Sequence, residues 1–184
     1  MRDTVIQEVL KHKIIAIVRG MDKEQTVNIA KALYEGGIRF IEVTFNQKKP
    51  EEFYKTADSI RAIREAMGDK MYVGAGTVTS VELVDMAAEA GALYMISPDM
   101  DEEVIKRTRE LGLVSMPGAY TATEAKKAYN AGADFVKLFP CIGDAPAYVK
   151  ALCAPLSHIP FLAVGGVDAG VGAKSGKLSR GRGL

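Results

Sequence analysis

A lysine stands in the middle of an apolar run, Phe135-Val136-Lys137-Leu138-Phe139. If this run is a β-strand, Lys137 lies on one face with the two phenylalanines, and Val136 and Leu138 lie on the other. Burial disfavours the ammonium form and lowers the pKa of a lysine, which frees its amine to attack a ketone. The alternative is a lysine near a strand end whose ammonium reaches solvent.

A carboxylate is embedded in a second apolar run, which covers residues 40–45. Strand alternation places Glu42 and Thr44 on the face opposite Ile41 and Val43. A carboxylate turned inward needs either a partner or a proton-transfer role. The alternative to a catalytic Glu42 is a structural ion pair, with Lys137 itself as a possible partner. Two ionisable residues that point into one interior strengthen the catalytic interpretation of each.

Three further segments suit the binding of an anion. Arg19 ends the first apolar run, where a guanidinium can bind a carboxylate or phosphate, although a surface arginine is equally compatible. Thr77 closes the run Gly74-Ala75-Gly76-Thr77, in which glycines permit close backbone approach and the hydroxyl can bind a carboxylate. Gly165-Gly166 follows the last apolar run, a position where barrels often bind phosphate through the backbone.

These residues are spread over seven strand candidates separated by helix-like segments. The strands are expected at residues 14–18, 40–45, 72–76, 93–97, 113–117, 135–139 and 161–165, and helices at 22–35, 80–90, 101–110 and 122–131, with an N-terminal helix at 2–11. Helix, glycine and strand follow one another in EGGIRFIEV, EAGALYMIS and NAGADFVKL. Such joins produce parallel strands with crossover helices. Without a dinucleotide glycine fingerprint, they favour a (β/α)8 TIM barrel over an open doubly wound sheet.

Composition excludes several classes of function. The net charge is +1 and tryptophan is absent, so nothing favours nucleic acid or a membrane surface as a partner. Cys141 and Cys153, and likewise His12 and His158, lack the spacing of a metal site or a disulfide framework. The N-terminus does not have the apolar core of a secretory signal, and no run can span a bilayer, so we expect a cytoplasmic protein.

The C-terminal end interrupts the repeating pattern. Residues 1–167 are expected to form a single barrel domain, and residues 168–184 an irregular tail rich in Gly, Lys and Arg. An eighth strand is missing from this interpretation. We favour a barrel truncated before its eighth strand, by shortening or a frameshift, over a natural flexible end.

With these residues in place, the chain resembles the family of 2-keto-3-deoxy-6-phosphogluconate (KDPG) and 2-keto-4-hydroxyglutarate (KHG) aldolases. The resemblance runs from about residue 5 to Val167. Residues 37–44, GIRFIEVT, are similar to the segment that carries the family's catalytic glutamate, and residues 132–140, GADFVKLFP, to the segment of its Schiff-base lysine. The segments 73–78, 97–98, 117–118 and 164–167 match in the same order.

The resemblance implies a class I aldolase that reversibly cleaves a 2-keto-4-hydroxy acid to pyruvate and an aldehyde. Lys137 would form the imine, and Glu42 would move protons, through water. The family needs no metal or other cofactor, acts on a small keto acid and is typically a homotrimer. A phosphate-binding isomerase without an imine, and a truncated inactive aldolase, are the alternatives.

The resemblance also implies how the substrate is held. Arg19 and Thr77 would bind its carboxylate, Pro98 and Phe139 would shape the pocket, and Gly165 and Gly166 would contact a phosphate.

Three departures from the family pattern bear on the choice of substrate. Asn46, which with Thr44 is a further candidate for substrate contact, stands where many members carry a carboxylate-binding arginine. Cys141 replaces a small residue after the lysine segment. The eighth strand, whose Gly-Ser step binds phosphate in the family, is missing.

Overall fold

The computed structural model describes residues 1–142 and 145–165, and strands alternate with helices throughout. The strands are β1 (Ile15–Val18), β2 (Phe40–Thr44), β3 (Tyr72–Gly76), β4 (Tyr94–Ile96), β5 (Val114–Met116), β6 (Gly118–Ala119), β7 (Val136–Leu138) and β8 (Phe161–Ala163). The helices are α1 (Arg2–His12), α2 (Lys23–Glu35), α3 (Phe53–Met67), α4 (Val81–Glu89), α5 (Glu102–Glu110), α6 (Ala122–Asn130) and α7 (Ala145–Cys153), with 3-10 turns η1 (Pro50–Glu52) and η2 (Gly68–Lys70).

The helices begin where the sequence offers caps. The side chains of Asp22, Ser80, Asp101 and Thr121 accept hydrogen bonds from backbone N–H groups in the first turns of α2, α4, α5 and α6. These side chains satisfy donors that have no partner within the helix. The helices predicted from residue 22, 80, 101 and 122 onward are confirmed to within a residue at their starts.

The strands are parallel and form two sheets, in the orders β1-β2-β3-β4-β5 and β6-β7-β8. The strand expected at 113–117 is confirmed as β5, and a further two-residue strand, β6, which was not predicted, follows it after Pro117. Pro117 accepts a hydrogen bond from the Lys137 N–H at 2.8 Å, but it has no N–H of its own to return. The Ser115 and Ala119 carbonyls accept from Asp134 and Phe139 on either side, at 2.9 and 3.0 Å, so the backbone still links the two sheets.

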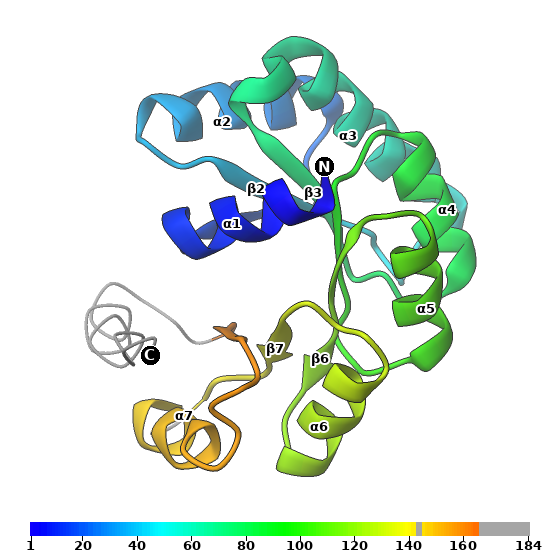
Figure 1. Cartoon of the computed structure of the whole chain (residues 1–184). Helices are drawn as coiled ribbons and strands as arrows, with labels where there is room; N and C mark the ends of the chain where they lie inside the picture. Colours follow the sequence, from blue (N-terminus) through cyan, green and yellow to red (C-terminus); the bar gives the residue numbers. More distant parts are fainter. Residues whose placement is uncertain (143–144, 166–184) are drawn as a thin grey trace.

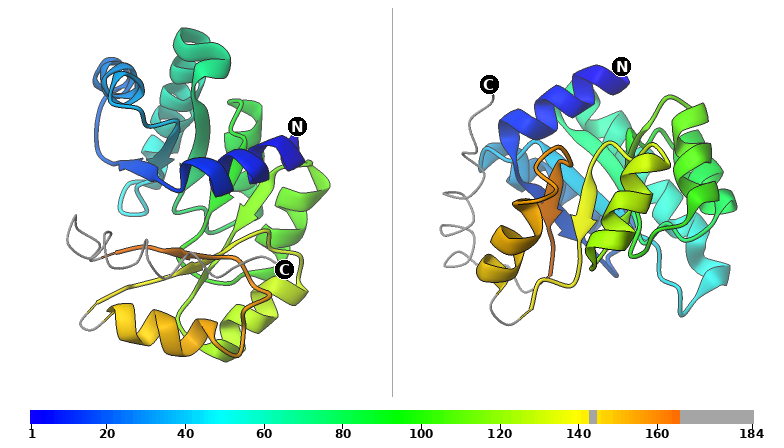
Figure 2. Two further views of the ribbon diagram at one scale, coloured as in Figure 1. Left: turned by 60° about the vertical axis from the view of Figure 1, so that its left-hand side comes forward. Right: turned by 60° about the horizontal axis from the view of Figure 1, so that its bottom comes forward.

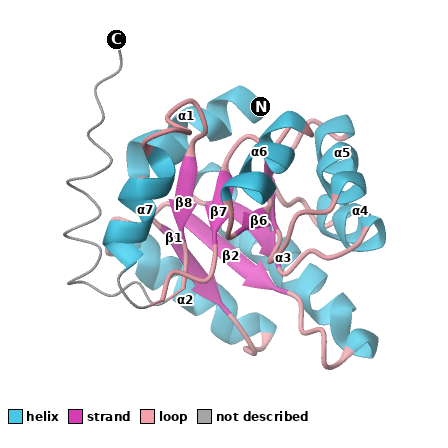
Figure 3. Ribbon diagram, turned by 90° about the horizontal axis from the view of Figure 1, so that it is seen from below, coloured by secondary structure: helices cyan, strands magenta, loops and turns pink. Residues whose placement is uncertain are grey.

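The strands curve into an arc with helices on its outer side (Figure 1). Seen from below, the strands occupy the centre and the helices surround them (Figure 3). Strands β7 and β8 run side by side, with α7 beside them (Figure 2). This is a TIM-barrel-like α/β fold, as the alternating pattern predicted. Within the described residues no hydrogen-bonded pairing joins β8 to β1, and the predicted tail at 168–184 lies outside those residues.

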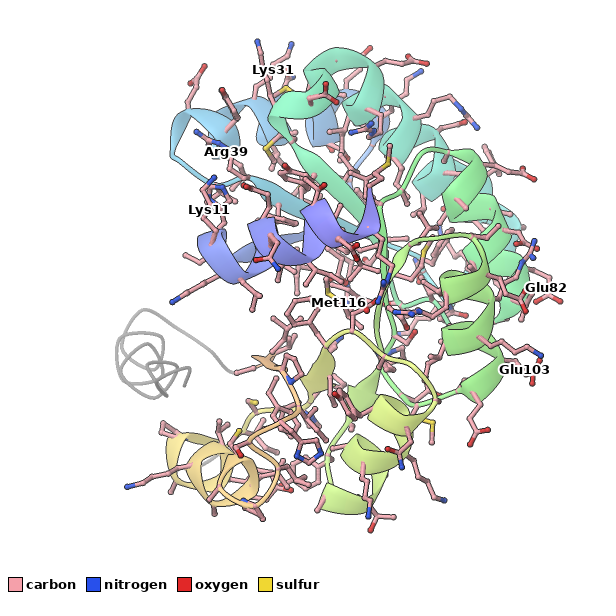
Figure 4. The ribbon with its side chains drawn as sticks, viewed as in Figure 1. Lys11, Lys31, Arg39, Glu82, Glu103 and Met116 are labelled. Atoms are coloured by element: carbon pink, nitrogen blue, oxygen red, sulfur yellow. The ribbon has the colours of Figure 1, made fainter. Side chains whose placement is uncertain are left out.

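Two apolar clusters occupy the two faces of the strands. Ile41, Val43 and Val73 pack outward with residues of α2, α3 and α4. Inside the arc, Phe40 and Met116 join Val5 and Val9 of α1, so this helix covers the N-terminal ends of the strands. Figure 4 shows Met116 within the arc, while labelled charged side chains such as Lys31, Glu82 and Glu103 project from the outer helices. The carboxyl ends of the strands are thereby left as the accessible end of the interior.

A buried carboxylate fastens α1 to the rest of the molecule. Asp134, which precedes β7, accepts hydrogen bonds from Arg2 of α1, from the Arg109 Nη1 at 2.8 Å and from the Ser115 N–H at 3.0 Å. Its side chain is only 4% exposed, so these donors replace water around the charge.

We expect Asp134→Ala to lower the free energy of unfolding by about 2–4 kcal/mol, because the Ser115 N–H and two guanidinium groups lose a buried acceptor. Urea unfolding monitored by circular dichroism would measure this. Asp134→Asn should cost less, since its amide oxygen still accepts from Ser115. Asp58→Ala, which removes an exposed pair with Arg61 on α3, is the control and should change stability by less than about 0.5 kcal/mol. Equal stability of the Asp134→Ala and Asp58→Ala variants would contradict this account of α1.

Candidate active site

Lys137 lies on the inner face of β7. Its neighbour Val136 packs outward with residues of α5 and α6, and Leu138 packs outward with Leu152 of α7. Phe135 contacts the inner cluster of α1 and β2, so the face predicted for Lys137 is confirmed as the inner one. The residue is 7% exposed, and its Nζ lies 4.7 Å from the centre of the Phe139 ring. Burial lowers the pKa of the Lys137 ammonium below its usual range.

Glu42 faces the same interior from β2. Ile41, Val43 and Phe45 pack against the outer helices, so alternation turns Glu42 inward, where it is 3% exposed. Burial raises its pKa to about 7, against the opposing effect of nearby positive charge on Lys137 and Arg19. A carboxyl group with this pKa exists in both protonation states near neutrality, which suits a group that accepts and returns a proton.

The two groups are electrostatically coupled without touching. Each shifts the pKa of the other through its charge, and no hydrogen bond between them contributes to either shift. Arg19 also acts on both groups, since its charge lowers the pKa of Lys137 and that of Glu42. Arg19 itself is exposed after the end of β1. No hydrogen bond joins Glu42 to Lys137, so the alternative of a direct ion pair between them is not what the structure shows.

Strand β3 pairs with the strand that carries Glu42 and forms the neighbouring part of the inner surface. Its inward positions are glycines, Gly74 and Gly76, while Val73 and Ala75 pack outward. The carboxylate of Glu42 lies against Gly76, and the ring of Tyr94 from β4 lies against Gly74. Tyr94 is fully buried, and its hydroxyl donates to the Ile41 carbonyl at 2.7 Å. The sequence predicted that the backbone would approach a ligand at these glycines, whereas in the structure protein side chains take up the room.

The predicted threonine and asparagine positions differ in what their side chains do. Thr77, at the end of β3, has a φ of 57°, a strained conformation for a β-branched residue and one that clusters at functional sites. Thr44 is 4% exposed, and its hydroxyl donates to the Val18 carbonyl at 3.4 Å. Asn46 is exposed, and its side chain accepts from the Lys48 N–H at 3.1 Å. Thr44 and Asn46 thus make contacts within the protein.

Two of the remaining pocket candidates, Phe139 and Gly165, are neighbours at the ends of β7 and β8. A Cβ on Gly165 would lie 3.3 Å from the Phe139 ring, so the two residues are neighbours. Gly165 has a φ of 86°, a conformation that favours glycine. Pro98, after β4, has its carbonyl against Gly118 of β6. Gly166 lies outside the described residues.

Sequence reasoning missed Tyr94, although its signal was present. In the run 93–97 strand alternation places Tyr94 inward, and a tyrosine there requires both space and a partner for its hydroxyl. One hollow in the structure lies away from the candidate site. A hollow of about 690 Å³ near α1 is lined by residues that include Lys11, Arg39 and Tyr72, at the opposite end of the strands.

In the described parts of the chain no three His, Cys, Asp or Glu side chains gather as metal ligands. Nor do these parts include a helix with the length and apolar character needed to cross a membrane.

Comparison with known proteins gives the same interpretation as the site. The family model for KDPG and KHG aldolases matches residues 5–172. The 2-dehydro-3-deoxy-6-phosphogalactonate aldolase of Escherichia coli K12 is 40% identical over 158 residues, which are 85% of this chain and 74% of that protein. The KHG/KDPG aldolase of the same organism is 33% identical over 158 residues, 84% of this chain and 70% of that one.

Solved structures agree with this assignment. A native KDPGal structure has a TM-score of 0.79 and 39% identity, and the match covers 87% of this chain and 75% of that one. The KDPG aldolase of Zymomonas mobilis ZM4, solved with 3-phosphoglycerate, has a TM-score of 0.76 and 26% identity over 89% of this chain and 75% of that one. The chain is an aldolase, a lyase that cleaves carbon–carbon bonds, and it belongs to the KDPG and KHG aldolase family.

Proposed function

We propose that Lys137 is the Schiff-base residue of this aldolase and that Glu42 moves the protons of the reaction. The observation that carries the proposal is a nearly buried lysine on the inner face of β7, close to the carboxyl end where barrel active sites form. Its lowered pKa increases the fraction of neutral amine, which is the nucleophilic form.

The reaction begins when the Lys137 amine adds to the C2 ketone of a 2-keto-4-hydroxy acid. Loss of water from the adduct gives a protonated imine, which can accept an electron pair. A base takes the proton from the C4 hydroxyl, the C3–C4 bond breaks, and its electrons pass into the imine to form an enamine. The aldehyde leaves, C3 takes up a proton, and water hydrolyses the imine to release pyruvate and regenerate the amine.

Glu42 suits both proton transfers because its pKa of about 7 allows it to take a proton and to return it. Transfer through a bound water is proposed because no hydrogen bond joins the Glu42 carboxylate to Lys137. Arg19 and Thr77 are proposed to bind the substrate carboxylate, since both stand at the carboxyl ends of inner strands. Phe139, Pro98, Gly165 and Gly166 are proposed to line the remainder of the pocket.

The substrate is proposed to be KDPG, KHG or a close analogue. The relatives are named for 2-dehydro-3-deoxy-6-phosphogalactonate, 2-dehydro-3-deoxy-phosphogluconate and KHG, all of which are 2-keto acids with a C4 hydroxyl. A homotrimer is proposed on the family resemblance, a cytoplasmic location on the character of the N-terminus, and a single barrel domain over residues 1–167 on the pattern of strands and helices. Parallel assays of pyruvate release from the phosphorylated and unphosphorylated acids would rank the substrates.

Incubation with pyruvate and sodium borohydride should leave a stable adduct on Lys137, because borohydride reduces the imine. Peptide mass mapping would locate it. Lys137→Ala should abolish the adduct and lower kcat by at least about 10³-fold. Lys106→Ala, at an exposed position of α5, is the control and should retain both. An isomerase that uses Glu42 without an imine would give a folded protein with no adduct, and that result would exclude the proposal.

Glu42→Gln should lower kcat by about 10²–10⁴-fold, the usual contribution of a positioned acid–base group. The adduct on Lys137 should still form. Since the Glu42 charge raises the pKa of Lys137, its removal should move the pH dependence of adduct formation to lower pH. If the pH dependence stays unchanged, the two groups are not coupled as described.

Ionisation of the buried Glu42 should lower the free energy of unfolding of the protein at high pH. Its pKa is raised from 4.5 to about 7 in the folded protein, so the contribution of its proton is present below pH 4.5 and is lost as pH rises through about 7. The Glu42→Gln variant avoids this loss, and at pH 8 it should exceed the wild type in unfolding free energy by up to about 3 kcal/mol. Urea unfolding at pH 5 and pH 8, with exposed Glu103→Gln as the control, measures the difference. A Glu42→Gln variant less stable than the wild type at pH 8 would contradict the cost of burial.

A further inference from the structure

Two residues on the inner face of β3, Gly74 and Gly76, have no side chain. The space beside each is occupied by a side chain from a neighbouring strand. A Cβ on Gly74 would lie 2.1 Å from the Tyr94 ring, and a Cβ on Gly76 would lie 1.7 Å from the Oε1 of Glu42. Neither separation is possible between real atoms. The Glu42 carboxylate therefore occupies the volume that a side chain at position 76 would need.

The requirement at Gly76 is for space and not for an unusual backbone. Gly74 and Gly76 are absent from the residues with positive φ, and Gly76 pairs in register with Thr44 of β2 as an ordinary strand residue. An alanine could adopt this backbone without strain. What it could not do is leave the Glu42 carboxylate where it lies.

The glycines of the interior differ in what an added methyl group would meet. At Gly74 it would meet the packed ring of Tyr94, and at Gly118 the backbone of Pro98, 2.2 Å from the carbonyl oxygen. At Gly76 it would meet the Cγ, Cδ and Oε1 atoms of one flexible side chain. An alanine at Gly76 should therefore move the Glu42 carboxylate and leave the fold in place.

The other end of the Glu42 residue is fixed separately. The Tyr94 hydroxyl donates to the carbonyl of Ile41, the residue before Glu42, from a fully buried position. The backbone that carries Glu42 is thus held by β4, and the tip of its side chain rests on β3. Among the described residues no hydrogen-bonding partner holds the Glu42 carboxylate. An alanine at position 76 would therefore displace the carboxylate without opposition from a hydrogen bond.

We propose that Gly76 is a positioning residue of the aldolase reaction, whose missing side chain seats the Glu42 carboxylate at a fixed place beside the Lys137 amine. The inference depends on the proton-transfer role proposed for Glu42. Many catalytic carboxylates are held in position by a hydrogen-bonding partner. Here the space at Gly76 is proposed to hold the Glu42 carboxylate in position instead. Displacement of a reacting group by about 1 Å can cost 10²-fold in rate, so a seat of this kind has a measurable effect.

The test is a double-mutant cycle of Gly76→Ala and Glu42→Gln on the full chain. Gly76→Ala alone should fold with a circular dichroism spectrum and thermal midpoint close to the wild type. It should lower kcat by about 10–100-fold, leave KM nearly unchanged and still give the borohydride adduct on Lys137. In the Glu42→Gln background the same alanine should have no further effect on kcat, because the group that it displaces no longer moves protons. Gly36→Ala, at an exposed helix end with negative φ and ordinary contacts of 3.4 Å, controls for the loss of a glycine.

Three outcomes would overturn the inference in distinguishable ways. If Gly76→Ala retains wild-type kcat, the seat does not position the carboxylate. If its effect multiplies with that of Glu42→Gln, the alanine acts on the pocket through another group. If Glu42→Gln itself retains wild-type kcat, Glu42 does not transfer protons in the reaction, and the position of its carboxylate against Gly76 does not matter for catalysis.

Discussion

The desolvation of two ionisable groups inside one lumen is the constraint on which the rest of the structure depends. Among residues 1–142 and 145–165, neither the ammonium of Lys137 nor the carboxylate of Glu42 has a direct ionic partner to offset its loss of water, and burial shifts each toward its neutral form. A fold can hold such groups only if the surrounding packing prevents them from turning outward. The outward apolar residues of β2 and β7 do this, because any rotation of the strands would expose Val43 or Val136 to water.

The residues of this site differ in how deeply they are buried, and the difference follows their proposed roles. The groups assigned to bond making and breaking lie below the surface, while Arg19 is exposed at the mouth and acts on them through its charge. A cation at the mouth attracts an acidic substrate and also lowers the pKa of the amine that the substrate will meet. If Arg19 binds the substrate carboxylate as proposed, one guanidinium both recognises the substrate and lowers the pKa of the amine.

Local sequence patterns were sufficient to predict much of this structure. Alternation in residues 40–45 and 135–139 predicted the inward faces of Glu42 and Lys137, since period 2 depends on the strand alone. Strand β6 and the fit of Glu42 against Gly76 were not predicted. Both depend on which residues of neighbouring strands stand opposite one another, and a single sequence does not contain that register. Tyr94 and Gly74 lie 20 positions apart in the chain, and their contact exists only once β3 and β4 have paired.

The fastening of α1 by Asp134 has a consequence for the order in which the molecule forms. The two partners, Arg2 and Asp134, are separated by 132 positions, so Arg2 leaves the ribosome well before Asp134, which follows after strands β1 to β6. Until those strands have formed, Val5 and Val9 have no inner cluster to pack against, and the apolar face of α1 is exposed to water. Contacts of such long sequence separation close late because a large loop must be ordered first. Helix α1 is thus made before the strands that it covers but docks only after them, and during that interval its apolar face is exposed to water.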